Sequence, residues 1–146
     1  DANTTTSNRI VRGICPQGWH LPSLNEWNTL IAFHNGVNNA GRKLKINSSA
    51  VWPNSDLQAG GLFNAVSAGE YYPWFENSFN STISGNRFVK TNFWTNSRGM
   101  FPNGSSAPNI VEITQEDLII VGTATQDQGA FGSIEQVGYS CRCVKN

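Results

Sequence analysis

The sequence has little charge and no long apolar run. Its ten basic and ten acidic residues make up only 14% of 146 positions and cancel at neutral pH. Lys and Arg form no cluster, which argues against binding to nucleic acid or to an anionic membrane surface. No apolar stretch approaches the length needed to cross a bilayer. We therefore expect neither a nucleic-acid partner nor membrane insertion by this chain.

Residues suited to catalysis or metal binding are also scarce. His20 and His34 are the only histidines, and they lack the Cys-x-x-Cys or His-Glu-x-x-His spacing of zinc sites. The acidic residues are scattered, so no pair suggests glycoside hydrolysis. We interpret His20 as a hydrogen-bonded framework residue, and His34 as a cation suited to a helix C-terminus. The sequence predicts a protein that is not an enzyme and that has no metal and no cofactor.

Aromatic residues and glycines are abundant by contrast. Aromatics make up 11% of the chain, with five tryptophans, and fourteen glycines accompany many Asn, Ser and Thr residues. This composition is typical of a loop-rich extracellular domain. The length suits one domain with a substantial core. We predict a flexible N-terminal segment over residues 1–8 and a single domain over residues 9–146.

One stretch carries a strong helix signal. Ser23 followed by Glu26 is a capping box, and Pro22 just before it cannot extend a helix backwards. Apolar residues then recur at spacings of three and four. The pattern predicts a helix from Leu24 to about His34 that ends near Asn35-Gly36.

Other segments predict short strands separated by long loops. Strands are expected over residues 9–14, 63–72, 87–95 and 137–144, and a hairpin over 109–114 and 118–125 around Gln115-Glu116-Asp117. Residues 42–46 suggest at most two helical turns, and loops are expected over 36–41, 47–60, 73–85, 97–108 and 126–136. The fold class is α+β, with one main helix, short antiparallel sheets and long loops. Long loops in a compact domain are usually functional.

Five motifs in order resemble the Fibrobacter succinogenes major paralogous domain, and they span nearly the whole chain. They are CPQGWHLPSLNEWNTL (15–30), AGRKLK (40–45), GLFNAVSAG (61–69), FWTNS (93–97) and GYSCRCVK (138–145). The resemblance implies a C-type lectin-like fold in a secreted or surface-anchored bacterial protein, in a family that mostly lacks assigned biochemistry. It also assigns four motif rings to the core, namely Trp19, Trp27, Phe63 and Trp94.

The three cysteines predict one disulfide and one free thiol in a secreted domain. The family has a cysteine at the position of Cys143 and a small apolar residue at that of Cys141. The resemblance therefore implies a Cys15–Cys143 bridge, with Cys15–Cys141 as the alternative. No activating base lies near Cys141 in the sequence, which favours a structural over a catalytic thiol.

The loops lack the calcium ligands of animal C-type lectins. Those lectins use carboxylates beside Pro-Asn or Trp-Asn segments, but Trp52-Pro53-Asn54, Phe101-Pro102-Asn103 and Ala107-Pro108-Asn109 carry apolar residues there. Aromatic rings among amides suit both sugars and protein partners. The predicted ligand-binding residues are Trp52, Asn54, Tyr72, Trp74, Phe101 and Asn103.

The predicted function is that of a non-enzymatic adhesion module. It would bind a glycan, or a host or bacterial surface protein, through these loops and without calcium. The alternative is a structural tip or spacer domain with no ligand site of its own. Solvent exposure of Trp52, Trp74 and Phe101 would distinguish the two.

Overall fold

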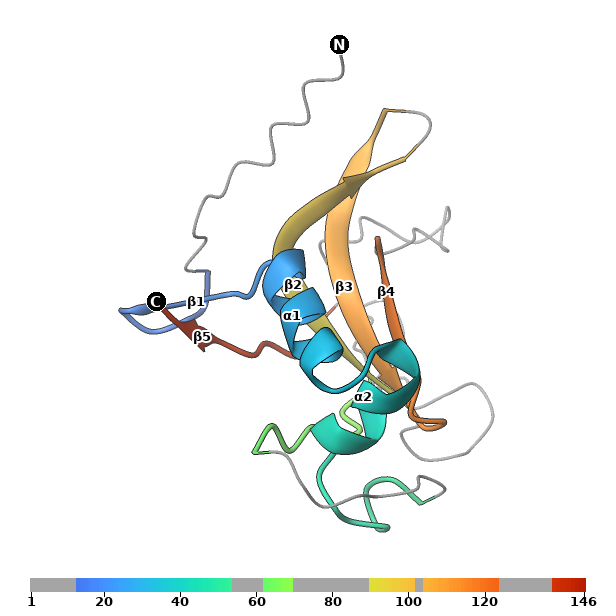
Figure 1. Ribbon diagram of the computed structural model, residues 1–146. Helices are drawn as coiled ribbons and strands as arrows, with labels where there is room; N and C mark the ends of the chain where they lie inside the picture. Colours follow the sequence, from blue (N-terminus) through green and yellow to red (C-terminus); the bar gives the residue numbers. More distant parts are fainter. Residues whose placement is uncertain (1–12, 54–61, 70–89, 102–103, 124–137) are drawn as a thin grey trace, which may run out of the picture.

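The computed structural model describes residues 13–53, 62–69, 90–101, 104–123 and 138–146. These residues form two helices, a three-stranded antiparallel sheet and a two-stranded antiparallel sheet (Figure 1). The prediction of an α+β class is therefore confirmed. The segment predicted to be flexible, residues 1–8, lies outside the described residues.

The helix α1 spans Leu24–Phe33 and begins as the sequence predicts. The Glu26 N–H donates to Ser23 Oγ at 3.2 Å. In return the Ser23 N–H donates to Glu26 Oε2 at 2.7 Å. These two bonds satisfy amide groups that the first turn of a helix otherwise leaves without partners. The capping box is confirmed.

The end of α1 is equally local in origin. Asn35 adopts a left-handed backbone with φ of 65°, a conformation that asparagine tolerates better than most residues. The Asn35 N–H donates to the Ala32 carbonyl and the Gly36 N–H to the Ile31 carbonyl. This pair of bonds is a Schellman motif, which terminates a helix. The predicted end at Asn35-Gly36 is confirmed.

A second helix, α2, spans Val37–Leu44 and corrects the prediction of a loop over residues 36–41. Its first residues follow Gly36, which provides no side-chain cap, and its asparagines and glycine are weak helix formers. Burial of Ala40, Gly41 and Leu44 stabilises it instead. A Cβ atom at Gly41 would stand 2.1 Å from the Asp117 carbonyl oxygen. Only glycine permits this close approach between α2 and the turn that joins β3 to β4.

The three-stranded sheet consists of β2 (Lys90–Met100), β3 (Ser106–Thr114) and β4 (Ile119–Thr123), in the order β2-β3-β4. The predicted hairpin between β3 and β4 is confirmed, with Asp117 left-handed in its turn. The expected loop over residues 97–108 is wrong in large part, because β2 and β3 stay paired as far as Met100 and Ser106. An irregularity between Trp94 and Arg98 lets the pairing resume beyond it.

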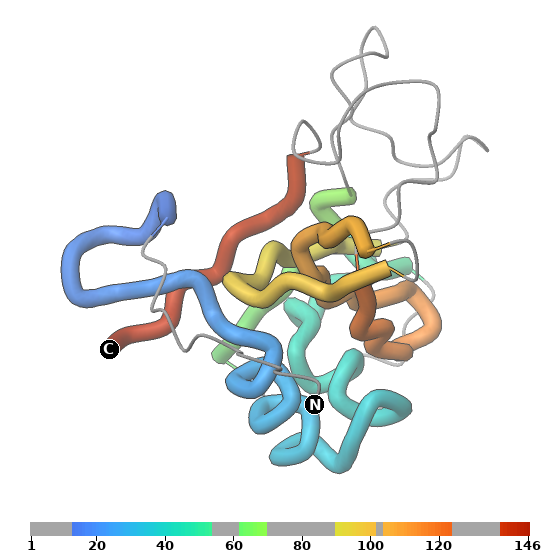
Figure 2. The backbone as a smooth tube through the Cα atoms, turned by 90° about the horizontal axis from the view of Figure 1, so that it is seen from above, coloured from blue at the N-terminus to red at the C-terminus, as the bar shows by residue number. Residues whose placement is uncertain are grey.

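The two-stranded sheet joins the two ends of the described chain. Strand β1 (Trp19–His20) pairs with β5 (Val144–Lys145), and Figure 2 shows the two terminal segments crossing beside one another. Two other expected strands, over residues 9–14 and 63–72, lie partly outside the described residues, and their described parts form no regular strand. Residues 63–69 make single bridges at Ala65 and Gly69, and Gly13 and Ile14 lie in a turn. Within residues 138–143 the pairing is likewise limited to isolated bridges.

The core lies between the two helices and one face of the three-stranded sheet. Its aromatic centre is formed by Trp27, Phe63 and Phe93, whose ring centroids are 5.3–5.6 Å apart. Two of the four rings assigned to the core fit less closely: Trp94 is half-buried against Tyr139, and Trp19 is 39% exposed. The assignment of Trp19 is wrong because β1 lies in the two-stranded sheet, outside the main core.

Candidate functional site

Trp52, a leading predicted contact, belongs to the core and not to an exposed surface. Its side chain is fully buried, and its indole Nε1–H donates to the Ala65 carbonyl at 2.9 Å. The Lys45 ammonium lies 4.5 Å from the ring centroid. A ring enclosed in this way is not available for stacking on a ligand. The expectation for Trp52 is therefore corrected: a polar loop brings the ring inward, where it finds both an acceptor and a cation.

The other predicted contacts are not brought together by the described residues. Asn54, Tyr72, Trp74 and Asn103 lie outside those residues. Phe101 is half-buried at the end of β2, where its N–H donates to the Ser105 carbonyl at 2.8 Å. This bond helps to close the turn between β2 and β3. Ligand contact by these five residues stays a prediction.

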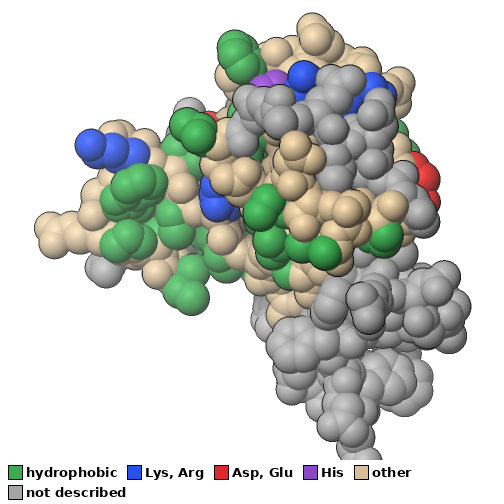
Figure 3. Space-filling view, turned by 90° about the horizontal axis from the view of Figure 1, so that it is seen from below, with side chains coloured by type: hydrophobic (Ala, Val, Ile, Leu, Met, Phe, Trp, Pro, Cys, Tyr) green, Lys and Arg blue, Asp and Glu red, His purple; other side chains and the backbone are tan. Residues whose placement is uncertain are grey.

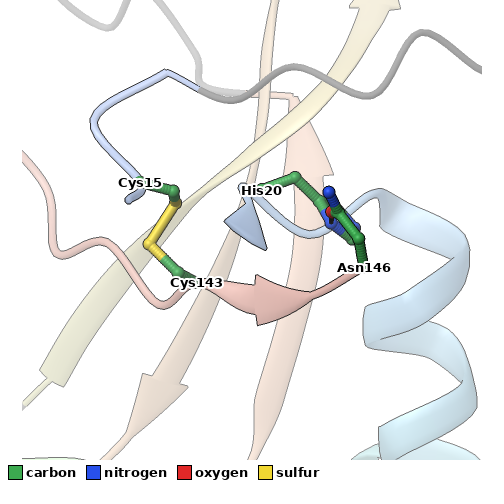
Figure 4. Close-up of a disulfide and its surroundings, with 4 residues drawn as sticks. All are labelled: Cys15, His20, Cys143 and Asn146. Atoms are coloured by element: carbon green, nitrogen blue, oxygen red, sulfur yellow. Dashed lines mark hydrogen bonds between the residues drawn. A yellow bond between two sulfur atoms is a disulfide. The ribbon is translucent and has the colours of Figure 1, made fainter. Parts of the chain in front are cut away.

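The disulfide joins Cys15 to Cys143 (Figure 4). The two residues are 128 positions apart in the sequence, with a Cα–Cα distance of 5.8 Å. The bridge that the family resemblance implied is confirmed, and Cys141 is a free, exposed cysteine. Partial burial of its sulfur raises the pKa of the Cys141 thiol. A raised pKa reduces the thiolate fraction, so the thiol is poorly suited to nucleophilic attack. The disulfide also indicates an oxidising compartment outside the cytoplasm.

His20 ties the helix start to the end of the chain. Its Nδ1 lies 2.7 Å from Asn146 Oδ1, and its Nε2 lies 2.9 Å from Glu26 Oε1. Figure 4 shows the His20 and Asn146 side chains beside one another. The bond to Asn146 is the main reason that the His20 pKa is raised; burial opposes the rise, and Glu26 adds to it. With both ring nitrogens engaged, His20 acts as the framework residue that the sequence predicts.

Glu26 is engaged on both of its oxygens. Oε2 accepts from the Ser23 N–H and hydroxyl, and Oε1 faces His20. Burial tends to raise the Glu26 pKa, but the bonds from Ser23 and His20 outweigh it and hold that pKa below its ordinary value. The carboxylate is therefore held as an anion, and each of its oxygens has a partner within the protein. It is positioned to stabilise a helix start rather than to transfer a proton.

An open groove of about 370 Å³ lies beside α1, and we take it as the candidate site. Its walls come from α1, from the segment around Phe63 and from the last described residues. Most of its lining is apolar, with charged groups at Glu26 and Arg142. The apolar lining residues are Pro22, Trp27, Leu30, Phe33, Phe63 and Val144. Phe33 is 79% exposed and gives the groove an apolar rim.

Arg142 is held in a defined position at this groove. Its guanidinium carbon lies 4.4 Å from the centroid of the Phe63 ring, a cation–π arrangement. Its Nη2 donates to the Phe63 carbonyl at 2.5 Å and approaches the Leu62 carbonyl at 3.5 Å. These contacts orient a side chain that remains exposed to solvent. Sequence reasoning missed it, although both Phe63 and Arg142 lie in motifs that carry the family resemblance.

Other kinds of site find no support in the described part of the chain. There, no three His, Cys, Asp or Glu side chains gather in a way that could hold a metal ion. Nor does that part contain a helix long and apolar enough to cross a membrane.

Comparison with known proteins identifies the family. Residues 4–145 match the sequence model of the Fibrobacter succinogenes major domain. No curated protein and no solved structure matches the chain. The match covers almost the whole sequence, including both cysteines of the disulfide and every residue that lines the groove.

Proposed function

The chain belongs to the Fibrobacter succinogenes major domain family, and from this premise we propose that it is a non-enzymatic ligand-binding module of a secreted or surface-anchored protein. Its ligand is a surface protein or a glycan, bound without calcium. We further propose that the fold is C-type lectin-like. Two helices on one side of a small sheet, with the chain's ends paired beside it, support that assignment.

The observation that carries the proposal is the apolar groove beside α1. Concave apolar surfaces with a few placed polar groups are the usual form of a binding site. Here Trp27 and Phe63 line the groove, and their rings pack edge to face against each other in the aromatic cluster. The capping box and the disulfide fix the two walls at their ends. A site on such a frame loses little conformational entropy when a ligand binds.

The absence of calcium ligands from the Pro-Asn segments supports calcium-independent binding. The third of these segments, Pro108-Asn109, lies within β3, where Asn109 is buried and its carbonyl accepts from the Thr95 hydroxyl. It is therefore part of the sheet and not of a metal-binding loop. We expect a chelator to leave both ligand affinity and thermal stability unchanged.

A spacer domain without a ligand site is the second candidate, and the burial of Trp52 favours it. A ring that serves the core removes one reason to expect a binding surface in that loop. The groove distinguishes the two functions. A spacer requires no open apolar cleft, whereas a binding module loses its affinity when the cleft is filled.

The test is to fill the groove and to measure binding of an apolar probe. Thr29 is exposed on α1 and lines the groove, so Thr29→Trp should occupy it. Its exposed neighbour Asn28 does not line the groove, and Asn28→Trp is the matched control. The probe is 1-anilinonaphthalene-8-sulfonate, whose fluorescence increases on transfer to an apolar site. We expect saturable binding by the wild type and by Asn28→Trp.

Thr29→Trp should weaken that binding at least tenfold, while circular dichroism and thermal unfolding show an intact fold. Equal probe affinity in the wild type and in Thr29→Trp would refute the groove as a binding site. Such a result would leave the spacer function as the better account. A loss in Asn28→Trp as well would show a general effect of the added ring and would refute the assignment equally.

A further inference from the structure

We propose that the groove binds a polypeptide segment in which a large apolar side chain stands next to a carboxylate, and that Arg142 binds the carboxylate. The inference rests on the proposed function and specifies its ligand. It depends on the charges at the groove, on how firmly Arg142 is held and on the shape of the apolar lining.

The groove has one anion and one cation in its lining, and the cation, Arg142, is the one with hydrogen-bond donors left for a ligand. Of its two charged lining residues, Glu26 has both oxygens engaged by Ser23 and His20. Arg142 is exposed and uses Nη2 for backbone carbonyls. A guanidinium has five N–H groups in a planar fork, so donors remain on its other nitrogens. An occupant that complements this groove carries an anion beside its apolar part.

The chemistry of the fork favours a carboxylate. Arginine binds carboxylates through parallel N–H···O bonds, which are stronger than bonds between neutral groups. The Phe63 ring and its carbonyl already hold the guanidinium, and the neighbouring Cys143 is fixed by the disulfide. Little rotamer entropy remains to be lost on binding. Arg142 is therefore prepared to bind a carboxylate, with its aliphatic stem and the ring forming an apolar border.

The shape of the groove favours a polypeptide over an acyl chain. The groove is open along α1, and its volume of about 370 Å³ is near the lower end for small-molecule sites. It has room for one or two large side chains, which is how a hot-spot anchor enters a partner protein. Phe33 is 79% exposed at its rim, and Leu62, next to Phe63 in the chain, is 96% exposed. Figure 3 shows hydrophobic side chains gathered on the face seen from below, with basic side chains among them.

The test uses two minimal probes of the same size, in one of which a neutral amide replaces the carboxylate. N-acetyl-L-phenylalanine carries a carboxylate, and N-acetyl-L-phenylalaninamide does not. Their affinities are measured by NMR titration of the ¹⁵N-labelled protein. We expect the carboxylate to bind about tenfold more tightly than the amide, the range of one charge-assisted hydrogen bond. Arg142→Gln should reduce this ratio to about one, and Arg142→Lys should restore part of it.

Lys145→Gln is the matched control, because Lys145 is an exposed cation on β5 that does not line the groove. It should leave the preference for the carboxylate unchanged. Thr29→Trp should weaken both probes. A preference that survives Arg142→Gln, or that disappears in Lys145→Gln, would show an effect of overall charge and overturn the role of Arg142.

The remaining outcomes separate this inference from the proposed function. Equal affinity for the two probes, with both lost in Thr29→Trp, would overturn the carboxylate but leave a binding groove. If neither probe binds, the inference is wrong, and the fluorescence titration decides the proposed function separately. Decanoate serves as the acyl-chain probe. If decanoate binds the wild type more tightly than N-acetyl-L-phenylalanine does, and if Thr29→Trp loses decanoate binding, the site takes acyl chains. The polypeptide assignment is then wrong.

Discussion

Replacing Asp117 with asparagine should strongly destabilise the protein, because it removes the carboxylate that pairs with the buried Lys45 ammonium. Lys45 Nζ lies 2.5 Å from Asp117 Oδ1 and 3.0 Å from the Gln115 carbonyl oxygen. The side chains of the pair are 0% and 8% exposed. Asparagine keeps the size and an oxygen acceptor, and it tolerates the left-handed backbone at position 117, where φ is 67°. The substitution therefore changes charge and little else.

The loss in the free energy of unfolding caused by Asp117→Asn can be estimated in several ways. At an effective dielectric constant of about 20, two unit charges at the observed distance attract by roughly 6–7 kcal/mol before desolvation is counted. Breaking a buried pair by removing one partner typically costs about 3–5 kcal/mol. Lys45 can also avoid the penalty by losing its proton. At pH 7 this costs about 4.6 kcal/mol for a lysine of ordinary pKa near 10.4. We expect Asp117→Asn to lower the free energy of unfolding by about 3–4.5 kcal/mol at pH 7.

The destabilisation caused by Asp117→Asn should become smaller as the pH rises. Burial lowers the pKa of Lys45, and Asp117 opposes that shift, so the variant lowers the pKa further. A lysine with a lowered folded-state pKa binds fewer protons when folded than when unfolded. Stability then increases with pH between the lowered pKa and the ordinary one. By pH 9 the cost of deprotonation is only about 1.9 kcal/mol, so the loss in Asp117→Asn should fall to about 2 kcal/mol.

Urea denaturation, followed by tryptophan fluorescence at pH 7 and at pH 9, measures the loss in the free energy of unfolding at each pH. In a Lys45→Met background the same Asp117→Asn change should cost less than about 1 kcal/mol, because no buried ammonium remains. A loss below about 1 kcal/mol at pH 7 in the Lys45 protein would refute the reasoning. So would a loss of the same size at both pH values.

Three further predictions concern the frame of the site. Trp52→Ala should lower the free energy of unfolding by about 3–5 kcal/mol, since the ring is fully buried; an unchanged urea midpoint would place the ring outside the core. His20 has a raised pKa, so its stabilising contribution is full below about pH 6.5 and is lost as the pH rises through that raised value. The difference in Tm between wild type and His20→Gln should therefore be larger at pH 5 than at pH 8. Peptide mapping without reduction should link Cys15 to Cys143, and removing both cysteines should cost up to about 5 kcal/mol; a link from Cys15 to Cys141 would contradict the assignment.

The elements that the sequence predicted well depend on neighbouring residues. The capping box of α1 needs only Ser23 and Glu26, and its end needs only a residue that tolerates a left-handed backbone. The hairpin between β3 and β4 follows from a polar turn between two apolar runs. Such signals can be recognised without the fold because the groups that satisfy one another lie within a few positions. The disulfide was also anticipated, through the family resemblance of the chain's two ends.

The errors occur where distant residues decide the structure. Helix α2 has weak local propensity, and its glycine packs against the Asp117 carbonyl across more than seventy positions. Residues 98–100 and 106–108, which include a glycine and a proline, form strands because they pair with one another across the sheet. In both places tertiary contacts override local preference.

For the candidate site too, the sequence predicted the parts that depend on neighbouring residues and missed the parts that depend on distant ones. By itself, the sequence determined the helix that forms one wall of the groove, the scarcity of metal ligands and the aromatic content. Only the tertiary structure decided which aromatic rings are available to a ligand. Trp52 is buried because the Ala65 carbonyl and Lys45 meet it in the interior. Arg142 reaches the groove because the chain's last residues return beside α1 and rest on Phe63, about 80 positions earlier. Contacts between such distant residues are set by how the whole chain packs, and no local pattern encodes them.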